Sequence, residues 1–351
     1  MSITPTLPKG SIILVTAANG FIATHIVDQL LQLGYRVRGT VRTPKPWLNK
    51  LFAKYGDGMF ETVIVDSLQN QSAFDEATKG VDGVIHTAAD MSFSSDADQV
   101  IPPTVAGLVN VMTSAAKQPS IKRVVLCSSS TACTLPKGFE PTVEITSETW
   151  DDEAIAMAYD LPDGIPESFK AYIVLAASRT EAEKAAWKFM KEQNPGFVFN
   201  AVLPDTTSKL KQLGKILDPE NIPGSTGGWI RNIYVKHDFD SWRILAPQYF
   251  IDVVDCARVH VAALLHPSAK SKRLFAYKEN FMQADILRIL RELKPDFDWP
   301  KDPEPAQTRD RSTVPEKKIS EEYVADLFGP VSWKNLEQSL RETFENVEGF
   351  Y

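Results

Sequence analysis

Short apolar runs alternate with helical patterns through the first 203 residues of this 351-residue chain. The expected strands are almost continuously apolar, which is typical of parallel strands covered by helices on both faces. They comprise residues 11–16, 36–41, 60–65, 83–87, 123–127 and 197–203. Apolar positions three or four residues apart predict helices over residues 21–33, 72–78, 103–116 and 176–191. This alternation predicts an α/β fold with a doubly wound parallel sheet.

The pattern becomes irregular after Pro204, and residues 218–228 have the composition of a loop. Further helices are expected over residues 252–265, 283–293, 320–327 and 332–344, with a proline-rich, charged connector at 295–315. We predict a first domain of residues 1–203 plus about 250–267, and a smaller discontinuous lobe of about 204–249 and 268–351. Loops at the carboxyl ends of parallel strands line the ligand crevice, so the smaller lobe is expected to bind the substrate.

The composition excludes several classes of function. A net charge of −7 and a pI near 5.4 give no basic field for nucleic acid. The sequence has no apolar stretch of 18 residues and no signal-peptide pattern, so we expect no membrane partner and a cytosolic location. The 3 cysteines lack Cys-x-x-Cys spacing, which favours free thiols over a disulfide framework or a metal site. The expected partner is a small-molecule substrate, bound by a monomer or a homodimer.

The first expected strand leads directly into a turn of small residues and then a helix. This segment contains Thr16, Ala17, Asn19, Gly20, Phe21 and Ile22. At such a turn, backbone N–H groups and a helix N-terminus bind the pyrophosphate of a dinucleotide. Ala17 is the weak point, because alanine is strained by about 1 kcal/mol or more if the turn needs a positive φ. A turn that binds nothing is the alternative for this loop taken alone.

Cationic residues gather near the end of the second expected strand. Arg38, Arg42 and Lys45 stand there, and no acidic residue does. This composition favours the 2′-phosphate of NADP(H) over the bare ribose of NAD(H), which usually binds a carboxylate.

Residues 170–187, KAYIVLAASRTEAEKAAW, resemble the active-site helix of the extended short-chain dehydrogenases/reductases. In that family a Tyr-x-x-x-Lys pair carries out the proton transfer. Alignment on Ser178 puts Leu175 at the tyrosine position and Arg179 at the lysine position. The segment after the fifth strand is similar to the family's serine-bearing turn, with Ser129 at the serine position. The resemblance is closest to fungal aldehyde/ketone reductases and dihydroflavonol-reductase-like enzymes, and it covers almost the whole chain.

The resemblance implies a Rossmann-type domain that binds NADP(H), and it names the site residues. The implied cofactor set is Thr16, Ala17, Asn19, Gly20, Phe21, Ile22, Arg38, Arg42, Lys45, Asp66, Ser67, Thr87, Ala88, Ala89, Arg179 and Pro204. The implied substrate set is Asp90, Ser129, Tyr172 and Trp229, and no metal is implied. Residues 248–260 form a further family signature, in which we expect His260 to be structural rather than a base.

Leucine neither donates nor accepts a proton, so the family's route is closed at Leu175, and losing a general acid typically costs about 10²–10⁴-fold in rate. The leading hypothesis is a redox-neutral cyclisation, isomerisation or elimination of a small apolar carbonyl compound in secondary metabolism. Arg179 and Ser129 would stabilise the developing negative charge, and NADP(H) would bind without net redox change. Two alternatives stay open. One is an NADPH-dependent carbonyl reductase with a substitute proton donor such as Tyr172, Asp90 or a water, and the other is a non-catalytic NADP-binding protein.

Overall fold

The computed structural model describes residues 3–90, 92–136, 143–161, 163–208 and 245–348. Within these residues, seven parallel strands form the central sheet in the order β3-β2-β1-β4-β5-β6-β9. The strands are β1 (Ile12–Val15), β2 (Arg36–Val41), β3 (Phe60–Ile64), β4 (Gly83–His86), β5 (Arg123–Cys127), β6 (Val198–Pro204) and β9 (Arg273–Ala276). The strand order reverses between β1 and β4. The carboxyl ends of these two strands therefore form the switch point at which such sheets bind ligands.

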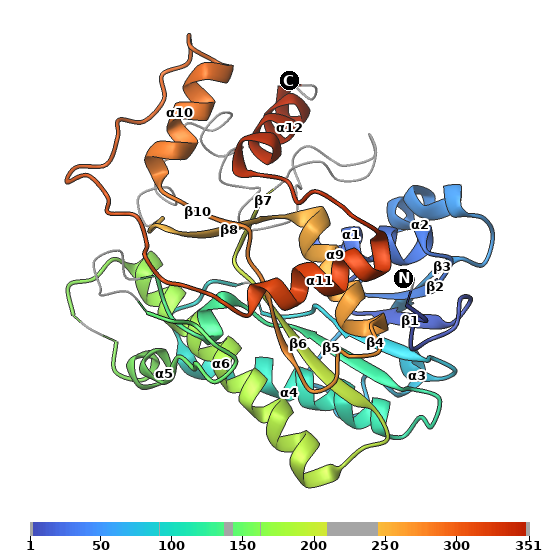
Figure 1. Ribbon diagram of the computed structural model, residues 1–351. Coiled ribbons are helices and arrows are strands. Elements are labelled where there is room, and N and C mark those ends of the chain that lie inside the picture. The colour runs from blue at the N-terminus through green and yellow to red at the C-terminus, as the bar shows by residue number, and fades with distance from the viewer. Residues whose placement is uncertain (1–2, 91, 137–142, 162, 209–244, 349–351) are drawn as a thin grey trace.

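Helices cover both faces of this sheet (Figure 1). One layer contains α1 (Phe21–Gln32), α9 (Val253–Leu265) and α11 (Lys317–Phe328), and the other contains α4 (Ala97–Ala116), α5 (Asp152–Ala158) and α6 (Glu167–Gln193). The short helices α2 (Pro46–Phe52) and α3 (Asp75–Thr78) follow β2 and β3. Neighbouring strand residues point to opposite faces, so Ile13 and Val15 belong to one apolar core and Leu14 to the other. This two-sided burial confirms the predicted doubly wound α/β sheet.

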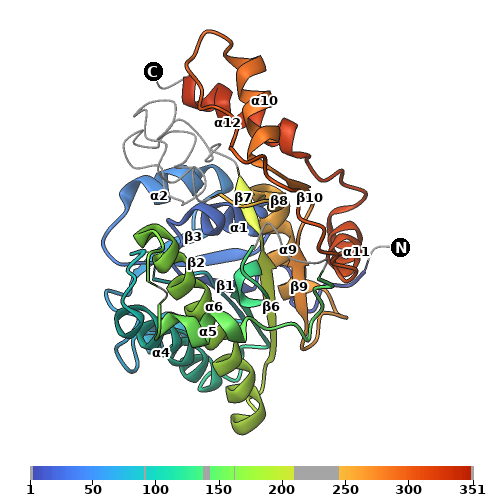
Figure 2. The same ribbon diagram turned by 90° about the vertical axis from the view of Figure 1, so that its left-hand side faces the viewer.

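A smaller sheet lies at one end of the molecule together with two further helices (Figures 1 and 2). It consists of β7 (Thr206–Ser208), β8 (Gln248–Asp252) and β10 (Glu279–Phe281), in the order β10-β8-β7. β8 pairs antiparallel with β10 and parallel with β7. α10 (Gln283–Leu293) and α12 (Leu336–Glu348) enclose a separate apolar cluster that includes Phe250 and Phe281. The smaller sheet therefore has a core of its own.

All six predicted strands are present, and the structure adds β9 as the seventh strand of the central sheet. The predicted domain division assigns these residues to the smaller lobe. β9 instead pairs with β6, and α11 packs against β9 and α9. The division into two domains remains a proposal, with β9 and α11 moved to the side of the central sheet.

Two long helices begin earlier than the sequence predicts. α4 starts at Ala97, before its two prolines, because the Asp96 carboxylate caps it by accepting hydrogen bonds from two backbone N–H groups. α6 starts at Glu167 rather than at residue 176. One unbroken helix therefore carries three predicted site residues, Tyr172, Leu175 and Arg179.

Candidate active site

Hydrogen bonds to Thr16 join the carboxyl ends of β1 and β4. Its Oγ1 accepts from the backbone N–H groups of Thr87 and Ala88, at 2.9 and 3.0 Å. The same oxygen lies 3.1 Å from Nδ1 of the buried His86, to which it donates its own proton. Burial and the charge of Arg179 lower the pKa of His86 to about 3, so the imidazole is neutral. These bonds fix the backbone at the switch point.

The turn from β1 into α1 has the geometry of a phosphate-binding loop. Ala17 adopts a φ of 48°, so the turn does require the left-handed region that strains alanine. The N–H of Ala17 donates to Thr40 Oγ1 at 3.1 Å, and the N–H of Ala18 donates to the Thr40 carbonyl oxygen at 2.9 Å. Gly20 begins α1 without a side-chain cap, which leaves N–H groups of the first helical turn available to an anion. The turn is completed by the half-buried Asn19 and Ile22 and the buried Phe21.

The cationic group near β2 is smaller than the sequence predicts. Arg42 is exposed and has no hydrogen-bond partner among the described residues, and the half-buried Lys45 precedes α2. The guanidinium of Arg38 instead binds Glu61 Oε1 at 2.6 Å and two carbonyl oxygens of residues 77–79 at 3.0 and 2.7 Å. We therefore withdraw Arg38 from the predicted cofactor set and retain Arg42 and Lys45 as the groups that fit a 2′-phosphate.

The other predicted cofactor residues lie at strand ends along the same edge of the sheet. They are Asp66 and Ser67 after β3, Ala88 and Ala89 after β4, and Pro204 at the end of β6. Asp66 is exposed, Ala88 and Pro204 are buried, and the rest are half-buried. The fold thus brings the predicted set together, and its contacts with a nucleotide stay a prediction.

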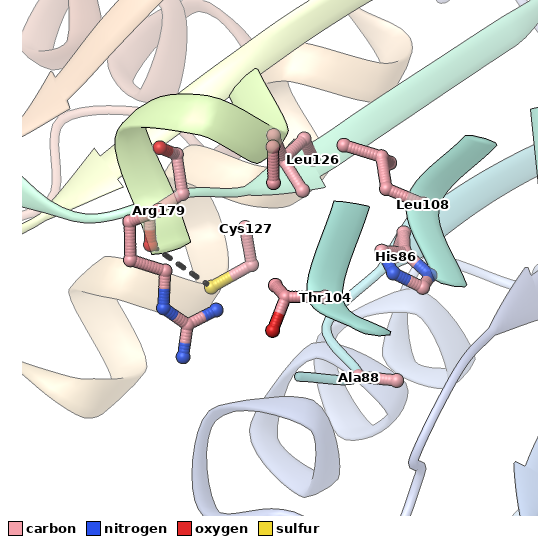
Figure 3. A pocket seen from close by; sticks show the side chains of 9 residues that line it. His86, Ala88, Thr104, Leu108, Leu126, Cys127 and Arg179 are labelled. Carbon is pink, nitrogen blue, oxygen red and sulfur yellow. Dashed lines mark hydrogen bonds between the residues drawn. The ribbon is translucent and has the colours of Figure 1, made fainter. Parts of the chain in front are cut away.

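A pocket with an empty volume of about 250 Å³, including its open mouth, lies beside Arg179. Figure 3 shows the Arg179 side chain extending from α6 toward the space that Cys127 and Thr104 also face. Burial lowers the pKa of Arg179, while Cys127 and Asp90 raise it. Since arginine remains protonated at neutral pH, one wall of the pocket has a fixed positive charge.

Ser129 follows β5 and caps the short 3-10 turn η2 (Ser130–Ala132). Its Oγ accepts hydrogen bonds from the Thr131 N–H at 3.2 Å and the Thr131 Oγ1 at 2.9 Å. A serine hydroxyl has one proton in addition to its two lone pairs. No acceptor for that proton occurs among the described residues, so Ser129 is arranged to donate to a bound oxygen.

α6 places Tyr172, Leu175 and Arg179 on one side of the helix, because they are three and four residues apart. Leu175 is half-buried and offers only hydrocarbon at the predicted proton-transfer position. Burial raises the pKa of Tyr172 above its usual range, and the charges of Asp205 and Asp151 raise it further. A phenol with a raised pKa is a weaker acid, so this environment weakens Tyr172 as a proton donor.

A buried ion pair between Glu183 and Arg273 lies behind the serine turn. Glu183 accepts from Ser128 Oγ at 2.6 Å and from Arg273 Nε at 2.7 Å, and the two charged side chains are 0% and 4% exposed. Arg273 also donates to the carbonyl oxygen of Thr149 at 2.6 Å and lies 3.8 Å from the ring centroid of Trp150. The pair joins β5, α6 and β9. The sequence gives no signal for it, because the partners are 90 residues apart.

Asp205 is a further site residue that the sequence analysis did not single out. It directly follows β6, and its Oδ1 accepts from the Thr206 N–H at 2.6 Å. Burial raises the pKa of this carboxyl to about 7. The signal was available, since a polar residue after a buried parallel strand lies at the ligand-binding edge of such a sheet.

The structure also locates the remaining predicted substrate residues. Asp90 accepts from the N–H and the hydroxyl of Ser92, at 2.8 and 2.6 Å, and its charge acts on Arg179. Trp229 and the loop at 219–228 lie outside the described residues. His260 is buried in α9 with Nδ1 at 2.8 Å from the Cys256 carbonyl oxygen, which supports its predicted structural role.

The described residues contain no cluster of histidine, cysteine or carboxylate side chains that could hold a metal ion. Cys127, Cys133 and Cys256 are free thiols. None of the described helices combines the length and the apolar character needed to cross a membrane.

A parallel sheet with an uncapped helix at its switch point is the arrangement of a dinucleotide-binding fold, to which this chain adds Ser129 after β5 and Arg179 on α6. In agreement, the model of the NAD dependent epimerase/dehydratase family matches residues 13–155. Aldehyde reductase 2 of Sporidiobolus salmonicolor is 38% identical over 342 residues, which is 96% of each chain. Ketoreductase adrE of Penicillium rubens is 41% identical over 341 residues, covering 95% of this chain and 96% of the relative.

The chain therefore belongs to the NAD dependent epimerase/dehydratase family, within the short-chain dehydrogenase/reductase superfamily, and the resemblance to fungal aldehyde and ketone reductases is confirmed. Another relative is the NAD-dependent epimerase/dehydratase terH of Aspergillus terreus, 35% identical over 97% of this chain and 98% of that protein. The solved structure of the yeast methylglyoxal/isovaleraldehyde reductase Gre2 complexed with NADPH shares the fold. Its TM-score is 0.78 at 24% identity, over 97% of this chain and 98% of that one.

Proposed function

We propose that this chain is an atypical short-chain dehydrogenase/reductase-like enzyme that acts on a small, mostly apolar carbonyl compound in a redox-neutral reaction of fungal secondary metabolism. The observation that carries the proposal is the side chain of Leu175. It stands on α6 between Tyr172 and Arg179, where the resemblance puts the family's phenol, and it has no proton to give. Cyclisation, isomerisation and elimination are the reaction types that need no hydride transfer.

Two side chains supply the electrostatic part of the proposed chemistry. Ser129 has a hydroxyl proton for a substrate oxygen, and Arg179 contributes a permanent positive charge in a partly desolvated pocket. Preorganised donors of this kind stabilise an enolate or alkoxide oxygen more strongly than water does.

NADP(H) is the cofactor that the described residues fit, and we propose that it binds without net redox change. The uncapped N-terminus of α1 would hold the pyrophosphate, and Arg42 with Lys45 would hold the 2′-phosphate. When bound, such a cofactor supplies or accepts a hydride. The monomeric or homodimeric state and the cytosolic location remain predictions.

The test is to measure product formation by the purified protein with and without NADPH. We expect turnover of a carbonyl substrate without loss of absorbance from NADPH. Consumption of NADPH in a one-to-one ratio with product would exclude the redox-neutral proposal.

The second candidate is an NADPH-dependent carbonyl reductase, which the names of the relatives favour. Proteins 38% and 41% identical to this chain are called an aldehyde reductase and a ketoreductase. This version needs a substitute proton donor, for which Tyr172, Asp90 and a water are the choices. If Tyr172 is the donor, Tyr172→Phe should remove most of the NADPH-dependent reduction. Retention of that activity would rule out Tyr172.

A further inference from the structure

Strand pairing places Asp205 at the level of the serine turn. In the parallel pair of β5 and β6, Cys127 is opposite Val202, and the next N–H, that of Ser128, donates to the Val202 carbonyl oxygen at 2.8 Å. The strand pairing ends there, because Ser130 begins η2, but the Ser130 hydroxyl makes a hydrogen bond to the Asp205 carboxyl. The Asp205 carboxyl therefore lies beside the serine turn that contains Ser129.

The surroundings of Asp205 contain both hydrogen-bond donors and a second carboxylate, Asp310. The backbone N–H groups of Thr206 and Tyr249 and the Ser130 hydroxyl lower the pKa of the carboxyl, but burial outweighs them and raises it to about 7. The titratable groups around it are Tyr172 on α6, Tyr249 on β8, Tyr277 after β9 and Asp310 in the connector before α11. A carboxyl whose pKa is raised toward neutrality is suited to act as a general acid or base.

We propose that Asp205 is the residue that moves the proton at this site, and that the substrate is an enolisable ketone. This inference rests on the redox-neutral function proposed above. The Asp205 carboxylate removes a proton from the carbon next to the carbonyl. The pair of electrons of the broken C–H bond forms the C=C bond of an enolate, and the carbonyl π electrons move to the oxygen that Ser129 and Arg179 stabilise. In a β,γ-unsaturated ketone the enolate extends over the neighbouring C=C bond, and Asp205 returns a proton to the γ carbon, which gives the conjugated isomer with no gain or loss of electrons. Exchange of the Asp205 proton with solvent, followed by its return to the first carbon, incorporates solvent hydrogen at that carbon.

Asp205 fits this role better than Tyr172 does. Burial, and after it the charge of Asp205, raise the pKa of Tyr172, whose phenol therefore stays protonated through the neutral range. A phenol that stays protonated does not compete with the carboxylate as a base. The leucine at residue 175 is explained in the same way, because an enolisation that uses a carboxylate base needs no phenol at that position.

The test uses a β,γ-unsaturated cyclic ketone, cyclohex-3-en-1-one, with the full-length protein and no NADPH. Its isomerisation to the conjugated enone is followed by ultraviolet absorbance. Incorporation of deuterium from D₂O at the carbon next to the carbonyl is followed in parallel by NMR. We expect wild-type protein to accelerate both processes, and Asp205→Asn to lose about 10²–10⁴-fold of the rate, as for other general bases.

Asp310→Asn is the matched control, because it removes a neighbouring carboxylate of the same size. The rate should rise with pH as the Asp205 carboxyl, with its pKa of about 7, loses its proton. Removal of the Asp310 charge should keep the maximum rate and shift this rise to lower pH, since that charge raises the pKa of Asp205. A purely structural role of Asp205 predicts no such shift. Thermal unfolding and NADPH titration of both variants verify that they fold.

The outcomes separate this inference from the proposed function. If wild type isomerises the ketone and a folded Asp205→Asn variant matches it, the assignment of Asp205 is wrong while the redox-neutral function survives. If wild type instead reduces carbonyls with stoichiometric NADPH consumption and Asp205→Asn abolishes that reduction, the redox-neutral function fails and Asp205 remains the proton-transfer residue. If wild type acts on the probe neither with nor without NADPH, both proposals are overturned.

Discussion

The cofactor edge of the sheet (residues 16–24, 40–42 and 87–88) and its reaction edge (residues 127–131, 172–183 and 204–205) are built on different kinds of interaction. At the cofactor edge, Thr16 and Thr40 bind backbone N–H groups of neighbouring strands, and the expected contacts with the pyrophosphate are also backbone groups. At the reaction edge, the proposed function depends on side chains such as Ser129 and Arg179. A backbone framework tolerates Ala17 at the turn with a modest strain. A side-chain mechanism does not tolerate leucine in place of an acid.

The largest expected effect is a gain of reductase activity when the reaction edge is changed. In Leu175→Tyr with Arg179→Lys, the ammonium should lower the pKa of the new phenol and restore a proton donor. We expect a gain of about 10²–10⁴-fold in NADPH-dependent reduction of simple aldehydes and ketones over the parent. Each single variant should gain less, because the two groups act together.

Two results would contradict the expected gain of reductase activity. One is a double variant that folds and binds NADPH yet reduces nothing in a broad carbonyl panel. The other is a parent protein that already reduces such substrates at ordinary enzyme rates.

The next largest effect concerns the ion pair behind the reaction edge. Arg273→Met leaves the Glu183 carboxylate buried without its cation, which should lower the free energy of unfolding by about 3–5 kcal/mol. Urea unfolding measures this loss. The double variant Glu183→Met with Arg273→Met should recover most of it, because two apolar side chains leave no unpaired charge.

Lys79→Met is the surface control for the ion-pair experiment. It breaks the pair between Lys79 and Glu76, whose side chains are 62% and 80% exposed, respectively. The free energy of unfolding should change by no more than about 0.5 kcal/mol. Equal effects of Arg273→Met and Lys79→Met would show that the reaction edge does not depend on its buried pair.

A smaller effect is expected from the cationic group at the cofactor edge. Arg42→Ala should weaken NADPH binding about tenfold, or about 1.4 kcal/mol, and leave NADH binding unchanged. Calorimetric titration of both nucleotides measures the difference. Arg38→Ala is the matched control and should leave the preference for NADPH intact, since Arg38 binds Glu61 and backbone carbonyls. An effect of Arg38→Ala as large as that of Arg42→Ala would restore Arg38 to the cofactor set.

The smallest effect should come from Ala17→Gly. Glycine removes a strain of about 1–2 kcal/mol at positive φ but costs about 0.5–1 kcal/mol of additional chain entropy, so the net gain is at most about 1.5 kcal/mol. The midpoint of thermal unfolding should rise by about 1–2 °C. Ala18→Gly, next to it and without a positive φ, should lower the midpoint. A fall in both variants would mean that the strain at Ala17 is negligible.

The strands of the central sheet could be predicted because a strand buried on both faces is a run of consecutive apolar residues. β9 is the exception, since it has only four residues, Arg-Leu-Phe-Ala, and begins with a charged side chain. Arg273 is compatible with a buried strand only because Glu183 neutralises it, and a partner 90 residues away is invisible in a local pattern. The start of α6 was missed for a related reason. Its first turns bury Ile173 and Val174 against α4 and α5, and such tertiary packing overrides local propensity.

The positions of the site residues could be predicted more fully than the residues with which they interact. Ser129, Leu175 and Arg179 come from adjacent elements as expected, because motif order fixes which strand end or helix turn each one occupies. The direction of the Arg38 side chain could not be predicted, since it depends on Glu61 of the neighbouring strand. The environment of Asp205 likewise arises from four separate elements, and no local pattern contains it.

The unbroken helix α6 carries both the side chains of the reaction edge and the residue that anchors them. Tyr172, Leu175, Arg179 and Glu183 follow one another at three- and four-residue steps, which is about 16 Å of helix at 1.5 Å per residue. Glu183, the last of these, binds Arg273 and lies one helical turn after Arg179, which lines the pocket. Because Glu183 is anchored, α6 keeps its position when side chains in its preceding turns are replaced. A lineage with this arrangement can exchange its reacting side chains one at a time without first having to rebuild the protein that carries them.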